Sequence, residues 1–206
     1  MKAVYNENLN DVLMFILADK GDSEISFDRK GRGARVFRQD SGQTVAWNIF
    51  EASKIIDIIG SGIVDIESED LEKINQELLT AGFDMVIPFD EQDKFVVGQI
   101  VEIEPHKDSD HLNITQVDVG QDENLQIVAG APNARLGLKT IVALPGAIMP
   151  NGSLIFGGEL RGVPSFGMMT SPRELNLPNA PEKRGIIELD DDAVIGESFS
   201  EAKHWK

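Results

Sequence analysis

FVVGQIVEIEPHKDSDHLNITQVDVG, residues 95–120, opens the stretch that decides the fold. The stretch continues through IVAGAPNARLGLKTIVALPGA (127–147) and ends with ELRGVPSFGMMTSPRELNLP (159–178). Short apolar runs separated by turn-forming residues predict strands at 95–104, 112–119, 125–128 and 139–144. Eight glycines from Gly130 to Gly167 indicate tight corners or a close approach of the backbone to a ligand. The pattern predicts a small all-β barrel.

Two local features predict how these strands curve. Gly98 lies inside the first strand, where a glycine marks a bend in a barrel strand. In 112–119 the apolar residues first occupy even positions and then odd ones, and the change falls at Thr115 and Gln116. A change of phase moves the side chains to the other face of a strand, so it predicts a β-bulge at these two residues.

The end of the chain is expected to complete the barrel. SPRE (171–174) is a capping box with proline at the first helical position, so it predicts a short helix. Residues 186–189 are predicted to form a returning strand. We therefore assign 90–200 to one barrel domain with a closing extension and expect 201–206 to be a frayed tail.

Residues 1–89 predict a separate small α+β domain of unknown role. Strands are expected at 11–18, 25–27 and 44–50, the last with Trp47 as a core residue. Residues 53–66 fit either strands or a short helix. The charged segment FDEQDK (89–94) marks the boundary between the two domains.

A helix is predicted over 68–81. Leu71, Ile74 and Leu78 fall on one helical face, and Gly82 stands where a helix would stop. Ser68 is expected to cap the N-terminus of this helix.

A basic segment lies in the front half of the chain. Residues 29–38, RKGRGARVFR, hold five basic side chains and no acidic one: Arg29, Lys30, Arg32, Arg35 and Arg38. The segment fits a solvated hairpin tip balanced by nearby acids better than a secondary contact for an anion or RNA. A dinucleotide-binding turn is excluded, because the third glycine and the following helix are missing.

The net charge of -16 limits the partners that the protein can have. An acidic chain is repelled by phosphate, so any binding of nucleic acid must come from a local patch. The chain has no cysteine, which excludes disulfides, thiolate metal sites and a cysteine nucleophile and fits a cytoplasmic location. No apolar run is long enough to span a membrane, and no signal peptide is expected.

The sequence shows no pattern typical of a catalytic or metal site. The segment HKDSDH (106–111) matches no zinc signature, so no metal is expected. Hydrolase, kinase and metalloprotease motifs are missing as well. We therefore expect no catalysis and no cofactor.

Several motifs in a fixed order give residues 95–196 a strong resemblance to a known family. They are Pro105-His106 with Asp110 and Leu112, QVDVG (116–120), AGAPN (129–133), GLK (137–139), LRGV (160–163), SFGM (165–168) with Ser171, and GIIELDDDAVIG (185–196). The stretch resembles the tRNA-binding domain of bacterial phenylalanyl-tRNA synthetase β subunits, methionyl-tRNA synthetase C-terminal extensions and endothelial-monocyte-activating polypeptide. The whole chain resembles stand-alone YtpR-type tRNA-binding-domain proteins.

This resemblance implies a five-stranded Greek-key OB-fold barrel that recognises folded tRNA by shape. The resemblance and side-chain chemistry together point to these candidate binding residues: Asn133, Arg135, Lys139, Arg161, Ser165, Met168 and Ser171. The cations suit phosphates, and the polar groups suit a phosphate or a 2′-hydroxyl. Met168 fits core packing as well, and Ser171 fits a capping role.

The sequence therefore predicts a non-catalytic, cytoplasmic tRNA-binding protein. The alternative is a protein-interaction scaffold or an auxiliary subunit that docks an aminoacyl-tRNA synthetase, or another basic partner, through its acidic surface. Stand-alone relatives often dimerise, so a homodimer is a further expectation from the resemblance. Loss of basic side chains and added salt would weaken tRNA binding, whereas acidic docking would not depend on those side chains.

Overall fold

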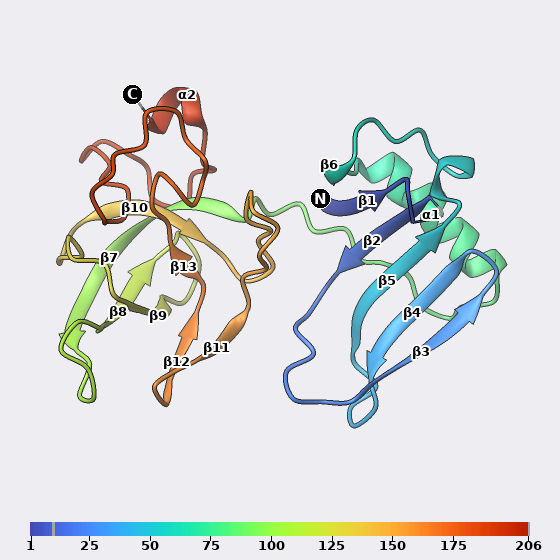
Figure 1. Ribbon diagram of the computed structural model, residues 1–206, viewed down its shortest axis with the longest axis horizontal. Coiled ribbons are helices and arrows are strands. Elements are labelled where there is room, and N and C mark those ends of the chain that lie inside the picture. Colours follow the sequence, from blue (N-terminus) through green and yellow to red (C-terminus); the bar gives the residue numbers. More distant parts are fainter. Residues whose placement is uncertain (10, 206) are drawn as a thin grey trace. The chain divides into compact units, whose positions relative to one another are not determined.

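The chain divides into two compact units, Met1–Gln92 and Asp93–Lys206, which we call the front unit and the barrel unit (Figure 1). The structure is a computed structural model that describes residues 1–9 and 11–205. Each unit has its own apolar core.

One antiparallel sheet of six strands forms most of the front unit. In sheet order the strands are β3 (Ile25–Lys30), β4 (Gly33–Arg38), β5 (Thr44–Phe50), β2 (Val12–Ile16), β1 (Lys2–Asn6) and β6 (Gly62–Asp65). The strands predicted in 11–18, 25–27 and 44–50 are confirmed. The ambiguous segment 53–66 contains part of a single 3-10 turn, η1 (Ala52–Lys54), followed by β6.

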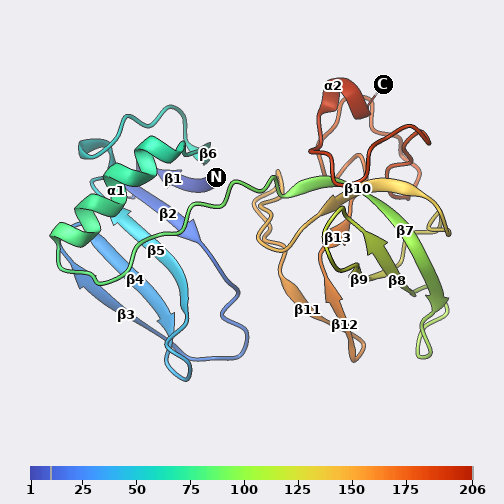
Figure 2. The ribbon, with the colours of Figure 1, turned by 180° about the vertical axis from the view of Figure 1, so that it is seen from behind.

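Helix α1 (Ser68–Thr80) covers one face of the sheet, and Figure 2 shows the unit from the helix side. The buried residues of the helix are the three that its periodicity predicts, and Gly82 follows it with a φ of 94°. The predicted cap is wrong. Glu67 takes the N-cap position without a side-chain cap hydrogen bond, and Ser68 lies within the helix.

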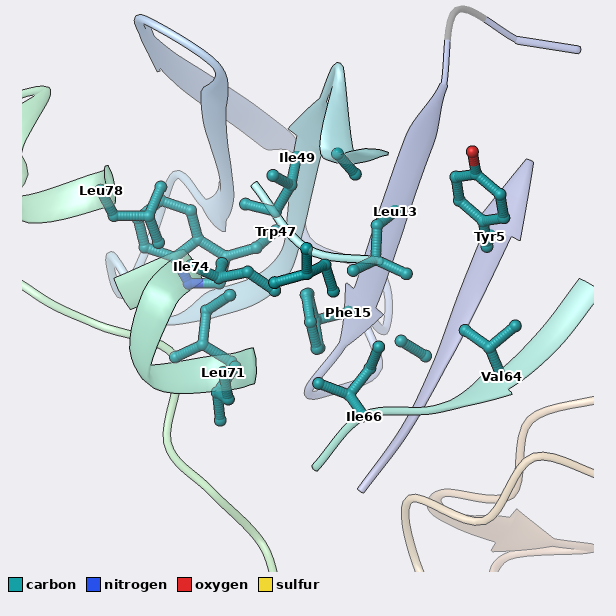
Figure 3. Packing of buried hydrophobic residues seen from close by; sticks show 14 of the residues in the cluster. Tyr5, Leu13, Phe15, Trp47, Ile49, Val64, Ile66, Leu71, Ile74 and Leu78 are labelled. Carbon is teal, nitrogen blue, oxygen red and sulfur yellow. The ribbon is translucent and has the colours of Figure 1, made fainter. Parts of the chain in front are cut away.

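The core of the front unit lies between α1 and the sheet, as Figure 3 shows. Trp47 is only 1% exposed, which confirms it as a core residue. Its ring meets the edge of the Phe83 ring at a centroid distance of 4.8 Å and an interplanar angle of 79°. Such edge-to-face contacts add to the burial of the two rings.

The barrel unit contains a nearly closed five-stranded antiparallel barrel. The strand order is β13 (Met168–Met169), β10 (Lys139–Ala143), β7 (Phe95–Pro105), β8 (Asn113–Asp118) and β9 (Leu125–Ala129). A hairpin of β11 (Gly157–Leu160) and β12 (Val163–Phe166) lies against β9. There the Gln126 side-chain amide donates to the Pro164 carbonyl over 2.7 Å. The α+β front domain and the OB-type barrel are confirmed.

Gly98 lies where the barrel interior has no room for a side chain. A Cβ atom there would lie 2.6 Å from Cγ2 of Val142 and 3.0 Å from Cγ1 of Val117. We expect Gly98→Val to lower the free energy of unfolding of the barrel unit by about 1–3 kcal/mol, because overpacking strains a core. Calorimetry should show a lower Tm for this variant. Gly158→Val is the control, since a Cβ at Gly158 meets nothing within 4 Å. Equal Tm values for the two variants would contradict the expectation.

The β7–β8 pair contains an irregularity on the strand opposite to the predicted one. The register shifts between Ile100 and Glu102 of β7, so Val101 is the extra residue. The bulge predicted at Thr115 and Gln116 is therefore wrong. Thr115 faces the core with 0% exposure, and its hydroxyl donates to a carbonyl of β9 over 2.7 Å. Because its hydroxyl has a hydrogen-bond partner, Thr115 can be buried like an apolar residue. The alternation of buried and less buried positions along β8 therefore continues without a bulge.

The segment after β13 forms a turn in place of the predicted helix. Both hydrogen bonds of the capping box are present: the Ser171 N–H donates to Glu174 Oε2 over 2.7 Å, and the Glu174 N–H donates to Ser171 Oγ over 3.3 Å. Asn176 adopts a left-handed φ of 53°, which stops helical propagation after one turn.

Residues 177–205 pack on the barrel as an extension. The segment predicted as a returning strand is not a strand. It is held by isolated backbone hydrogen bonds: the N–H groups of Ile187 and Leu189 each donate to a barrel carbonyl over 2.9 Å. Glu201–His204 form helix α2, and the Trp205 indole N–H donates to the Pro178 carbonyl over 2.7 Å. Residues 201–205 thus contact the extension, and the fraying expected at 201–206 stays a prediction. Lys206 lies outside the described residues.

Candidate nucleic-acid interface

A groove of about 330 Å³ lies between β9, β13 and the C-terminal extension, and we call it the barrel groove. Residues that line it include Gly130, Pro132, Met168, Ser171, Arg173 and Arg184. Gly130 and Pro132 also line a second hollow together with Asp110 and His111, so the polar surface continues beyond the groove. Gly130, the first of the eight glycines from Gly130 to Gly167, therefore lies in the wall of a concave surface.

Three cations belong to the barrel groove, and they differ in their contacts. The Arg173 Nε–H donates to the Pro181 carbonyl over 2.9 Å. Lys183 and Arg184 also line the groove and are exposed, and neither side chain forms a hydrogen bond or ion pair within residues 1–9 and 11–205. The two side chains can therefore meet an external anion without breaking a hydrogen bond, although the charge of Lys183 also acts on Glu188 and helps to lower its pKa.

Two of the predicted site residues line the barrel groove. Met168 is half-buried and packs against the small apolar cluster of Ala143, so it serves the core and the groove wall together. Ser171 lines the groove while its hydroxyl oxygen accepts the capping hydrogen bond. Core packing by Met168 and capping by Ser171 are thus both compatible with a place in the groove wall.

Three other predicted residues hold the C-terminal extension in place. The Asn133 amide brackets Ile186, because Oδ1 accepts from its N–H over 3.0 Å and Nδ2 donates to its carbonyl over 2.9 Å. Arg135 pairs with Glu188 over 2.7 Å. Lys139 donates to the carbonyls of Asp191 and Ala193 over 2.6 and 2.7 Å. The structure gives these three side chains internal partners, and none of the three lines the barrel groove.

The last two predicted residues belong to the β11–β12 hairpin. Arg161 lies at the tip with a φ of 50° and donates to the Asp108 carbonyl over 2.6 Å. The Ser165 hydroxyl oxygen accepts from the Val128 N–H over 3.1 Å and so links β12 to β9. Neither residue lines the barrel groove.

Lys183 and Arg184, which line the barrel groove, were not among the candidate residues predicted from the sequence. The signal was the segment PEKRG (181–185), in which two adjacent cations are enclosed by proline and glycine. Such a segment is typical of an ordinary turn, and only the packing of the extension brings it to the groove. Arg173 had an indication in the sequence, since a cation in the first turn of a helix is unfavourable.

Glu188 connects the extension to the barrel in a pH-dependent way. The Arg135 guanidinium, followed by the Asn133 amide, lowers the pKa of the Glu188 carboxyl. A carboxyl with a lowered folded-state pKa stabilises the protein above its ordinary pKa, and this contribution is lost as the pH falls through the folded value. The pair is about half exposed, so screening keeps the effect small.

We expect Glu188→Gln to lower the Tm slightly at neutral pH and not at all in strong acid. The reason is that Glu188 of the natural chain becomes neutral as well once the pH is below its lowered pKa. Thermal unfolding of both proteins from neutral to acidic pH measures this difference. A Tm difference that does not shrink in acid would show that the charge of Glu188 is not what matters.

The basic segment 29–38 does not form one surface. Lys30 lies over the Phe83 ring on the helix side, and Arg32 pairs with Glu51 and Glu77. Arg35 donates to Thr44, and Arg38 donates to the Asp19 carbonyl. Arg29 alone has neither a hydrogen bond nor an ion pair among the described residues, and its guanidinium lies 4.0 Å from the Phe50 ring centroid.

No group of three or more histidine or acidic side chains that could hold a metal ion is found in the described ranges 1–9 and 11–205. His106 of the HKDSDH segment is buried, and its Nδ1 accepts from the Asp108 N–H over 3.1 Å. Among the helices within the same ranges, none has the length and apolar character needed to cross a membrane.

Comparison with known families assigns a separate match to each unit. The family described as "Putative tRNA binding domain" matches residues 95–198, which cover the barrel and most of its extension. The family described as "Domain of unknown function (DUF4479)" matches residues 20–90.

Similar proteins fall into two kinds. The "Putative tRNA-binding protein YtpR" of Bacillus subtilis is 38% identical over 200 residues, which are 97% of this chain and 99% of that protein. The phenylalanine–tRNA ligase β subunit of Idiomarina loihiensis is 46% identical over 138 residues, 66% of this chain and 17% of the subunit. The same subunit of Rhodospirillum rubrum is 52% identical over 103 residues, 50% of this chain and 12% of the subunit. Similarity to the ligase subunits therefore covers a small part of their length.

Proposed function

The chain belongs to the tRNA-binding-domain family, and from this premise we propose that it is a non-catalytic protein that binds folded tRNA by its shape. The observation that carries the proposal is the barrel groove with its two available cations, Lys183 and Arg184. Cations that form no ion pair among the described residues can neutralise phosphates without breaking such a contact first.

The chemistry of the barrel groove suits a backbone better than a base sequence. Lys183 and Arg184 can contact phosphate oxygens, and arginine does so with two parallel hydrogen bonds. Ser171 can contact a ribose hydroxyl, the group that separates RNA from DNA. Contacts to phosphate and sugar position a protein without reading bases, so the recognised property is the spacing of phosphates in a folded RNA.

The net charge of -16 sets the strength and the salt dependence of such binding. The bulk of the protein repels the polyanion, and the groove attracts it locally. We therefore propose a modest affinity that falls steeply with salt, by about ten-fold or more between about 50 and about 200 mM.

The shape proposal is tested with labelled folded tRNA and with unstructured RNA of equal length. Fluorescence anisotropy at two salt concentrations should show tighter binding of folded tRNA, and binding of both RNAs should weaken with salt. Equal affinity for the two RNAs would contradict recognition by shape. No binding of either RNA at low salt would contradict the function itself.

A further inference from the structure

The front unit has a second sheet face, opposite α1, which we call the open face; Figure 1 views the sheet from this side. The strand register places Phe27, Val36 and Ala46 in one row across β3, β4 and β5. The neighbouring row contains Arg29, Ala34 and Asn48. Within the front unit, no described helix covers this face.

Apolar side chains dominate the open face, and several are well exposed. Phe27 is 66% exposed, Ile25 is 47% exposed and Ile63 is 36% exposed. Phe27 pairs with Val36 across the two strands, and together with Ile25 these side chains make a contiguous surface. Exposed apolar surface of this kind typically marks a place where something binds.

The open face contains a hollow of about 350 Å³, which we call the base slot. Small Ala34 forms its buried floor, Phe27 and Val36 form one side, and Phe50 belongs to the other side. The remaining lining residues are Ile25, Ser26, Arg29 and Asn48. Apolar and aromatic walls with a few polar groups are typical of sites for small ligands.

Two polar side chains of the base slot, Arg29 and Asn48, form neither a hydrogen bond nor an ion pair among the described residues. The Arg29 guanidinium stacks 4.0 Å from the Phe50 ring centroid and has no ion pair among the described residues. The Asn48 amide, which lies half-buried among apolar neighbours, forms no hydrogen bond within the same residues. An amide in an apolar setting usually finds a partner, so its donors and acceptor are available to a ligand.

Charge on the open face is the reverse of that of the whole front unit. Residues 1–92 carry nine basic and eighteen acidic side chains. The strand register places three basic side chains, Lys2, Arg29 and Arg38, on the open face. It places one acidic side chain there, Asp65, which pairs with Lys2. The face is therefore positive within an acidic unit and complements a polyanion.

We propose that the base slot binds the base of an unpaired, unstacked RNA nucleotide, with Arg29 on its phosphate. The base stacks on Phe27, and the Asn48 amide bonds to its edge, as in sites where aromatic side chains and arginine hold single-stranded RNA. This inference rests on the proposed function and deepens it, because it assigns unpaired nucleotides of the tRNA to the front unit. Asn48 and Arg29 favour this occupant over an apolar protein surface, which would leave both polar groups unsatisfied.

The test uses the 15N-labelled full chain and hexaadenylate as the probe. Amide signals of residues 25–29, 34–36 and 48–50 should shift on titration. Phe27→Ala should weaken binding of the probe about ten-fold, the usual effect of losing one stacking partner. Phe27 is mostly exposed, so this variant is expected to fold. Leu79→Ala is the matched control, since Leu79 is a 46% exposed apolar residue on α1.

Each outcome decides the inference separately from the proposed function. Shifts on the open face that weaken in Phe27→Ala and not in Leu79→Ala support the base slot, even if folded tRNA fails to bind the barrel. Binding of folded tRNA without hexaadenylate shifts on the open face overturns the base slot alone. A third outcome is that the natural chain forms dimers, the Phe27→Ala variant is monomeric, and hexaadenylate causes no shifts. This outcome overturns the base slot and shows that the open face is an interface between copies of the chain.

Discussion

Trp47→Ala is expected to lower the free energy of unfolding of the front unit by about 3–5 kcal/mol, the usual cost of deleting a large buried ring. The indole is almost completely buried and contacts the Phe83 ring, so its removal leaves a cavity between α1 and the sheet. A small domain has only about 5–15 kcal/mol of stability in total. Much of the front unit's stability should therefore be lost.

Urea denaturation followed by circular dichroism measures this loss. The barrel unit has a separate core, so its transition should keep its midpoint while that of the front unit moves to lower urea. Leu79→Ala, on the exposed side of α1, should change the front unit by less than about 0.5 kcal/mol. If the front unit of Trp47→Ala unfolds at the same urea concentration as that of the natural chain, the packing described is contradicted.

The double variant Lys183→Ala/Arg184→Ala is expected to weaken binding of folded tRNA by roughly 10- to 100-fold. Each cation is available for one charge-assisted contact, and losing two such contacts gives an effect of this size. The slope of log affinity against log salt should fall by about one for each phosphate contact removed. Anisotropy titrations at several salt concentrations measure both quantities.

Two comparisons separate this local effect from net charge. Lys20→Ala/Lys73→Ala removes two positive charges from the front unit, and we expect its affinity to stay close to that of the natural chain. Arg135→Ala should weaken binding less than the groove variant, because Arg135 is already paired with Glu188. Equal losses from all three variants would mean that overall charge, and not the barrel groove, governs binding.

The elements predicted best are those that local patterns determine. The period of Leu71, Ile74 and Leu78 is enough to predict α1, because one helical face is read within a few residues. The barrel strands follow from apolar runs between glycines for the same reason. Thr115 shows the limit of this approach, since its burial depends on an acceptor in the neighbouring strand.

The site could be predicted only in part, because a sequence does not show which cation already has a partner. Arg135 and Glu188 are 53 residues apart, and so are Asn133 and Ile186. These long-range contacts use side chains that the sequence offered as binding residues. Lys183 and Arg184 reach the barrel groove only because the extension folds back onto the barrel. The charge of a side chain can be read from the sequence, whereas its freedom to bind a ligand depends on the contacts that the fold gives it.

Hydrogen–deuterium exchange of the full chain, with and without folded tRNA, tests the central claim most directly. Peptides covering 127–132, 168–174 and 183–186 form the barrel groove, and bound tRNA should slow their exchange. At equal concentration, tRNA should slow exchange of the same peptides much less in Lys183→Ala/Arg184→Ala. If tRNA binds and slows exchange only in other segments, the barrel groove is not the site of binding.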